Sequence, residues 1–173
     1  MQNKLVHGNT KVKLVVPLAA GFLFVLGAFK IHAVMFPNIP TFVLERSKAM
    51  HVSPREALEV NYIHDRVASG GALTESQWST VQGLFSSKNI EQERFGLLIL
   101  GQLNKTKYRL EAIHYAEGLI DSMDASVRSR SLTVLARLHD SRWKGIALRN
   151  QNSTDPIVKQ SAAALLERQE RFK

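Results

Sequence analysis

The hydrophobic pattern divides the chain into one continuous apolar run near its amino terminus and a series of amphipathic segments after it. The run extends from Leu14 to Phe36, with only Lys30 and His32 as polar interruptions. A helix needs about 20 apolar residues to cross the hydrocarbon core of a bilayer, and this run exceeds that length. The pattern therefore predicts a single transmembrane helix, or signal-anchor, over residues 14–36.

A cleaved secretory signal is the alternative interpretation of this run. Residues 1–13 carry three lysines and no acidic residue, which also fits the basic region that precedes a signal core. The triplets at 27–29 and 31–33 each contain a bulky residue, so neither is a good cleavage site. We therefore favour an uncleaved anchor. A soluble, buried helix is the third possibility.

Basic residues on both flanks of the run bear on its orientation. The tail before the run is short and wholly without acidic residues, whereas Glu45 lies among the charges that follow it. Lys and Arg tend to stay on the cytoplasmic side of a membrane helix. This favours a cytoplasmic amino terminus and an extracytoplasmic domain, although basic residues occur on both sides.

After Pro40 the chain has the periodicity of helices rather than strands, and signals for helix starts recur at short intervals. Ser53-Pro54-Arg55-Glu56 forms a capping-box pattern, and Thr74 to Gln77 repeats it. Asn89 and Asp124 are good N-cap residues. Helices are expected over residues 42–52, 54–69, from 74 onward, 90–103, 107–123, 125–138, 140–150 and from 156 onward.

These boundaries give four segments and an all-α fold class. They are a basic amino-terminal tail (1–13), the transmembrane helix or signal-anchor (14–36), a juxtamembrane linker or short helix (37–53) and one helical domain (54–173). The last segment is long enough for one domain with a sizeable core.

Three segments of the helical domain resemble one another, at residues 92–103, 127–138 and 158–166. Each begins with polar or basic residues and ends with an apolar pair. A small residue stands midway in each copy, namely Gly96, Ser131 and Ala162. A small residue permits close approach of helices, and the apolar pair needs a neighbouring unit to cover it.

The second and third copies resemble the HEAT-like repeat family of armadillo-type α-solenoids. Residues 124–128, Asp-Ala-Ser-Val-Arg, and the leucines after them match the aspartate and valine-arginine pattern of that family, and residues 155–159 match nearly as well. The first copy departs from the pattern because Gln92-Glu93 replaces valine-arginine. The resemblance covers about residues 74–171 and implies a short right-handed α-solenoid of about three HEAT-like helix pairs. An ordinary helical bundle is the alternative.

Composition narrows the classes of chemistry that the chain can perform. Cysteine is absent, which excludes disulfides, thiolate metal sites and a thiol nucleophile. No histidine pairs with a second ligand at helical spacing, and His64 and Asp65 are neighbours whose side chains are expected to diverge on a helix. We predict no catalytic residue, no bound metal and no cofactor, and therefore a protein that is not an enzyme.

The formal net charge of +8 is shared between the amino-terminal segment and the carboxy-terminal half. In the latter, basic residues concentrate in one interval that contains Asp140 as its only acid. Arg130 and Arg137 are seven apart and lie on nearly the same helix stripe. The candidate partner-binding residues are Arg128, Arg130, Arg137, Arg142, Lys144 and Arg149. The simpler interpretation is a solvated face neutralised by acids such as Glu117, Asp121 and Asp124.

These features predict a single-pass, membrane-anchored scaffold or adaptor that binds another, membrane-associated protein, as an accessory subunit of a membrane complex. The bilayer itself is the second expected partner, through residues 14–36. A module that binds anionic lipid or nucleic acid through the basic interval is one alternative, and nucleic acid is the weaker of the two. An enzyme-maturation factor with helical repeats is another.

Overall fold

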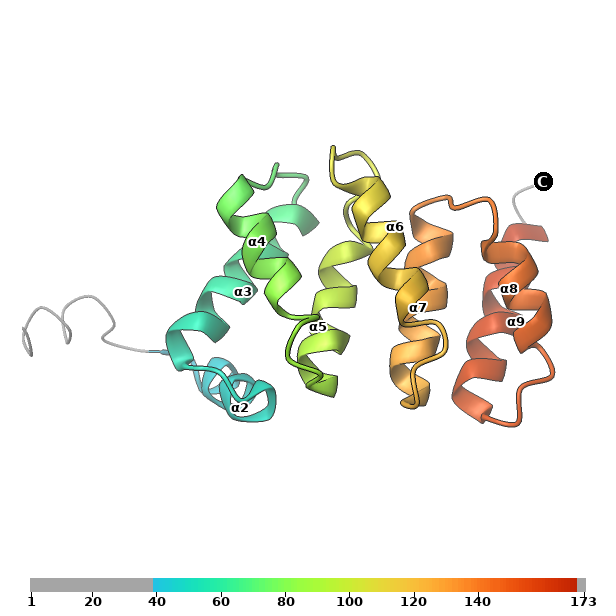
Figure 1. Cartoon of the computed structure of the whole chain (residues 1–173), viewed down its shortest axis with the longest axis horizontal. Coiled ribbons are helices and arrows are strands. Elements are labelled where there is room, and N and C mark those ends of the chain that lie inside the picture. The colour runs from blue at the N-terminus through green and yellow to red at the C-terminus, as the bar shows by residue number, and fades with distance from the viewer. Residues whose placement is uncertain (1–38, 171–173) are drawn as a thin grey trace, which may run out of the picture. The chain divides into compact units, whose positions relative to one another are not determined.

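The computed structural model describes residues 39–170, and these fold into helices joined by short turns (Figure 1). No strand occurs within this range, so the predicted all-α class is confirmed for it. The helices are α2 (Thr41–Met50), α3 (Pro54–Ala68), α4 (Glu75–Gly83), α5 (Ile90–Leu100), α6 (Arg109–Gly118), α7 (Ala125–Arg137), α8 (Trp143–Asn150) and α9 (Pro156–Glu170).

The predicted basic tail and transmembrane helix, residues 1–13 and 14–36, lie outside the described residues. Between residues 39 and 170, no helix has both the length and the apolar character needed to span a bilayer.

The starts of α3, α4, α5 and α7 follow from local capping chemistry, as the sequence predicts, whereas α2, α6 and α8 begin without a side-chain cap and α8 begins at Trp143 rather than at Asp140. Ser53 Oγ accepts a hydrogen bond from the Glu56 amide at 3.2 Å, and a Glu56 carboxylate oxygen accepts one from the Ser53 amide at 2.8 Å. Thr74 and Gln77 form the same reciprocal pair at the start of α4. These contacts satisfy amide groups that lack partners in the first helical turn.

The helices that contain the three similar segments pack against one another. Figure 1 shows α3 to α9 side by side in chain order, and α5 contacts α7, which in turn contacts α9. Helices α4, α6 and α8 each pack against the helix that follows them. Between α7 and α9, the hydroxyl oxygens of Ser129 and Ser161 lie 2.5 Å apart.

Helix α5 forms the centre of the core, in agreement with its nearly continuous apolar sequence. Leu97, Ile99 and Leu100 are each at most 1% exposed. Gly96 leaves room for the ring of Phe85, because a Cβ atom at position 96 would overlap that ring. The small residue of the first copy therefore allows close packing on α5.

Helices α5 and α6 end earlier than the expected ends at residues 103 and 123. Helix α5 stops at Leu100 and α6 at Gly118. Leu103 is fully buried and Leu119 is half-buried, both in the turns that follow. Apolar spacing alone extends a predicted helix too far where the chain turns but still faces the core.

Helix α2 packs as part of the helical unit, against α3 and α5. The side chain of Gln92, which is buried on α5, donates a hydrogen bond of 2.6 Å to the carbonyl of Met50 at the end of α2. Ser87 in turn donates to the Gln92 side-chain oxygen at 2.6 Å. The hydrogen bonds of this buried amide fix the end of α2 on α5.

Candidate partner-binding groove

Two adjoining cavities form a groove along α2, α5 and α7. The larger encloses about 420 Å³ and the smaller about 240 Å³, and Leu98 and Arg130 line both. We call their combined surface the α2–α7 groove. Its other lining residues are Phe42, Glu45, Arg46, Ala49, Met50, Glu91, Arg94, Phe95, Leu97, Thr133, Val134 and Arg137.

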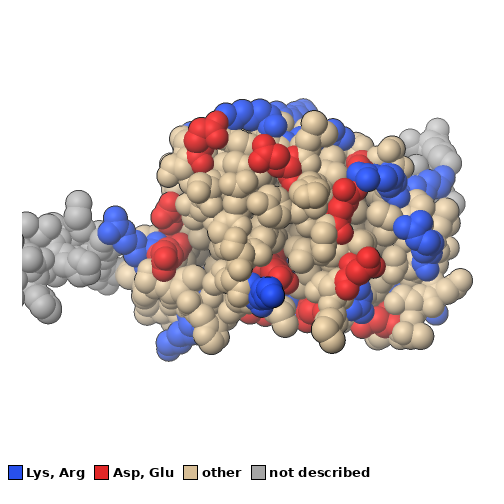
Figure 2. Space-filling view, viewed as in Figure 1, with Lys and Arg blue, Asp and Glu red and all other residues tan. Residues whose placement is uncertain are grey.

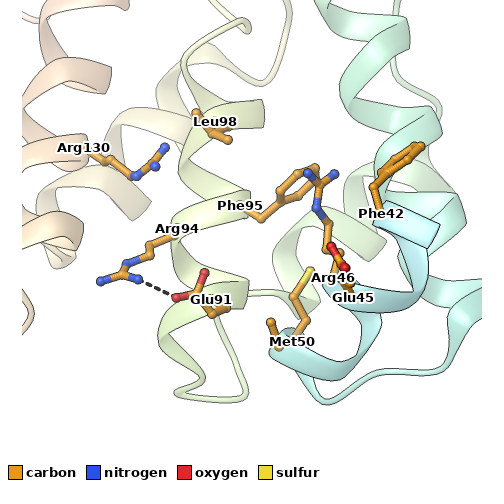
Figure 3. A pocket seen from close by; sticks show the side chains of 10 residues that line it. Phe42, Glu45, Arg46, Met50, Glu91, Arg94, Phe95, Leu98 and Arg130 are labelled. Carbon is orange, nitrogen blue, oxygen red and sulfur yellow. Dashed lines mark hydrogen bonds and ion pairs between the residues drawn. The ribbon is translucent and has the colours of Figure 1, made fainter. Parts of the chain in front are cut away.

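The α2 end of the groove is aromatic. Phe42 is 55% exposed, and Phe95 lies beneath the guanidinium of Arg46, whose carbon is 4.3 Å from the ring centroid. Figure 3 shows Arg46 between these two rings. Arg46 also donates a hydrogen bond to the side-chain oxygen of Asn61 on α3. A guanidinium stacked on a ring is held in place by the negative face of the ring.

The α7 end of the groove is cationic. Arg130 is half-buried and extends from α7 toward α5, as Figure 3 shows. Arg137 lies seven residues further along α7, about two turns away, on nearly the same face of the helix. The stem of Arg137 passes over Gly101, where a Cβ atom would lie 3.4 Å from its Cδ. Within the described part of the chain, neither arginine has a carboxylate at ion-pair distance.

The remaining arginine of the groove, Arg94, is already neutralised. It pairs with Glu91 on its own helix and contacts both carboxylate oxygens of Asp124, the N-cap of α7, at 3.0 and 3.1 Å. Burial raises the pKa of the Asp124 carboxyl. The hydrogen bond from the Val127 amide and the pairing with Arg94 outweigh this effect and lower the pKa below its usual value.

A second ion pair links α7 to the start of α9. Arg128 Nη2 lies 3.4 Å from the carboxylate of Asp155, which precedes α9 and accepts a hydrogen bond from the Ile157 amide at 2.9 Å. The same guanidinium donates to the carbonyls of Ser122 and Met123 at 2.7 and 2.9 Å. Arg128 therefore holds helix ends together.

Of the other predicted partner-binding residues, Arg142 is paired with carboxylates, whereas Lys144 and Arg149 lie exposed outside the groove. Arg142 bonds Asp140 through two contacts of 3.1 Å and also pairs with Glu117. The hydrogen bonds from Arg142 lower the pKa of the Asp140 carboxyl, although burial opposes them. Lys144 and Arg149 are exposed on α8 and line neither cavity of the groove.

The structure thus brings together Arg130 and Arg137 from the predicted set, but does not join them to Lys144 and Arg149 in one cavity. Figure 2 shows Lys and Arg side chains at the α8–α9 end and also along the upper edge of this view, with acidic side chains among them. The sequence reasoning missed Phe42 and Arg46 on α2 and Phe95 on α5, which the packing of α2 against α5 brings together. Their only early signal is an aromatic residue near a cation in residues 42–46.

Histidines and acidic residues do not form a metal site in the residues that the structure describes, where no three of them lie close enough together. The expectation that the side chains of His64 and Asp65 diverge is wrong. His64 Nδ1 lies 3.0 Å from a carboxylate oxygen of Asp65. The Asp65 side chain is 80% exposed, so this is a surface contact.

No family model, no curated protein and no solved structure matches this chain.

Proposed function

We propose that the chain is a membrane-anchored, non-enzymatic adaptor whose helical domain binds another protein in the α2–α7 groove. In this proposal residues 14–36 form the anchor, and α4 to α9 form a short α-solenoid of HEAT-like helix pairs. The groove is the observation that carries the proposal. It combines an exposed aromatic ring, Phe42, with arginines that have no acidic partner among the described residues.

The helix packing supports the solenoid part of the proposal. The three similar segments occupy α5, α7 and α9, which pack in succession. Their small residues Gly96, Ser131 and Ala162 are all buried. Arg94 and Arg128 each pair with the aspartate that precedes the next of these helices. The two arginines stand at different positions of the aligned segments, but both link one helix to the start of the next, which fits stacked repeats.

A protein partner is better supported than nucleic acid or an anionic membrane surface. Those two ligands would be expected to use a broad array of available cations. Here Arg128 and Arg142 are already bonded to carboxylates, and the unpaired Arg130 and Arg137 line one cavity together with Leu97, Leu98 and Val134. Aromatic and arginine side chains around an apolar centre are the residues that dominate protein interfaces.

Site-specific photo-crosslinking would test the protein-binding part. Phe42 is replaced by a photoreactive phenylalanine in the full chain, expressed in its native cells. Tyr62 on α3 provides the matched control, because it is aromatic, 56% exposed and lines neither cavity. We expect a discrete adduct with another protein from position 42 and none from position 62. Equal labelling from both positions, or none from either, would contradict the proposal.

Membrane extraction of the same cells would test the anchor. The full chain should remain in the membrane fraction after an alkaline wash and should be released by detergent. Deletion of residues 14–36 should move it to the soluble fraction. Release of the full chain by the alkaline wash would show that it is not anchored through a membrane span.

A further inference from the structure

The two ends of the α2–α7 groove differ in chemistry, and this difference restricts what it can bind. At the α2 end, the exposed ring of Phe42 lies beside Arg46, and Met50 and Phe95 line the cavity as buried residues. At the α7 end, Arg130 and Arg137 flank Thr133. Because both cavities share Leu98 and Arg130, a single ligand can contact both ends.

Charge along the groove is not balanced by its own acids. Glu91 is occupied by Arg94, and Glu45 lies on α2, at the aromatic end. Arg130 and Arg137 have no carboxylate partner in the part of the chain that the structure describes. The Arg137 side chain passes close to Gly101, where a Cβ atom would lie 3.4 Å from its Cδ. A bound carboxylate would therefore meet two guanidinium groups whose charge no carboxylate of the described residues neutralises.

From this arrangement we infer that the groove recognises an acidic segment of a partner protein, with one large apolar side chain at the α2 end and carboxylates at Arg130 and Arg137. This inference rests on the proposed protein-binding function and specifies the partner for that site. The apolar side chain packs on Phe42 and Leu98. The carboxylates supply the negative charge that the α7 end lacks.

An acidic peptide suits this groove better than a lipid does. An acyl chain would need a long, apolar channel, whereas four arginines and two glutamates line the two cavities together. A peptide can place one apolar side chain on the short aromatic part and keep its polar backbone and carboxylates along the rest. Peptide recognition commonly combines an anchor pocket with charged positions of this kind.

Selection from a random peptide library would test the inference, because it requires no identified partner. Peptides of about 12 residues, long enough to cover a groove of this kind, are displayed against the full chain in an uncharged detergent. The Arg130→Glu/Arg137→Glu variant is used for counter-selection. We expect enrichment of Asp and Glu together with Phe, Leu, Trp or Met. Failure to recover peptides, or recovery of peptides without acidic residues, would overturn the inference.

Binding of a selected, fluorescently labelled peptide then assigns the residues. The Arg130→Glu/Arg137→Glu variant should bind at least about tenfold more weakly, because each reversal replaces attraction by repulsion. Lys144→Glu/Arg149→Glu changes the net charge equally but alters α8, outside the groove, and should bind normally. An equal loss in both double variants would mean that the peptide responds to net charge alone, which overturns the inference.

A matched pair of serine variants tests the apolar end of the α2–α7 groove. Phe42→Ser should weaken peptide binding by about tenfold, as expected for the loss of an aromatic anchor. Leu148→Ser removes a side chain of similar exposure, 49% against 55%, from α8 and should have no effect. Circular dichroism of both variants verifies that the helices are retained. Unchanged binding by Phe42→Ser would remove the apolar part of the inference.

Competitors distinguish the other classes of ligand. A short single-stranded oligonucleotide and a short-chain anionic phospholipid are added to the labelled complex. Neither should displace the peptide at concentrations where the unlabelled peptide does, and stronger displacement by either would overturn the inference. If the peptide selection fails while photo-crosslinking from position 42 still captures a protein, the adaptor function stands and the acidic partner does not. If the peptide selection and the photo-crosslinking both fail, the adaptor function and the acidic partner are both overturned.

Discussion

The two edges of α7 carry arginines that differ in their surroundings. Toward α9, Arg128 donates to two backbone carbonyls and pairs with Asp155. Toward α5, Arg130 and Arg137 line the groove and have no acidic partner among the described residues. Arg128 and Arg130 are only two positions apart, so they point in different directions around the helix.

This difference shows why a count of basic residues does not define a binding surface. An arginine that closes helix ends contributes to folding, and its charge is already neutralised. An arginine without a partner contributes little to folding but keeps its charge for a ligand. Measurements of stability can test this division between arginines that hold the fold together and arginines whose charge remains free for a ligand.

The link between α5 and α7 gives the largest expected effect. Asp124→Ala removes the N-cap of α7 and one of the two carboxylate partners of Arg94. We expect the free energy of unfolding to fall by about 2–3 kcal/mol, from loss of the cap together with loss of the half-buried ion pair. Urea unfolding followed by circular dichroism measures it. Asp121→Ala, at an exposed neighbouring position, should change stability by less than about 0.5 kcal/mol.

The two edges of α7 are compared directly by Arg128→Met and Arg130→Met. The first substitution leaves Asp155 and two carbonyls without their donor, and we expect a loss of about 1–2 kcal/mol in unfolding free energy. The second should change stability by less than about 0.5 kcal/mol, since Arg130 has no bonded partner to lose within residues 39–170. Equal losses in the two variants would show that Arg130 is also structural.

Much of the helical framework was predictable because its signals are local. Ser53 and Thr74 fix helix starts through contacts within three residues, and Asn89 and Asp124 do the same. The burial of α5 followed from an apolar sequence on nearly all sides. Helix ends were less predictable, because buried residues such as Leu103 continue the apolar pattern after the helix has stopped.

The groove was only half predictable. Arg130 and Arg137 could be selected from helical spacing, but their separation from Lys144 and Arg149 depends on how α7 and α8 pack. The aromatic end depends on the placement of α2 against α5. Gln92, which stands where the other two similar segments have valine, contributes to this contact through its bond to Met50, beside the stacking of Arg46 on Phe95. A local difference among the three similar segments thus marked a tertiary contact.

A pH titration separates the charge of Asp124 from its capping role, because Asn is an equally good N-cap. The native pKa of Asp124 is lowered, so its ionised form stabilises the fold above the unfolded pKa of about 4, and this contribution is lost as the pH falls through the native pKa. Asp124→Asn should therefore be less stable than the natural chain at pH 7, by about 1 kcal/mol, and the difference should vanish in strong acid. Urea unfolding across this pH range measures the difference. A difference that is constant with pH would mean that the Arg94 pair does not stabilise the fold.

The smallest effect concerns Ser131, which lies between the two edges of α7. Its side chain is fully buried, and its hydroxyl has no hydrogen-bond partner among the described residues. Since a buried hydroxyl without a partner is costly and Ala favours the helix, Ser131→Ala should leave stability unchanged or raise it by up to about 1 kcal/mol. The same urea titration measures the change. A loss of stability would show that the hydroxyl has a partner, such as a buried water, and that polar contacts extend into the middle of α7 as well as along its α9 edge.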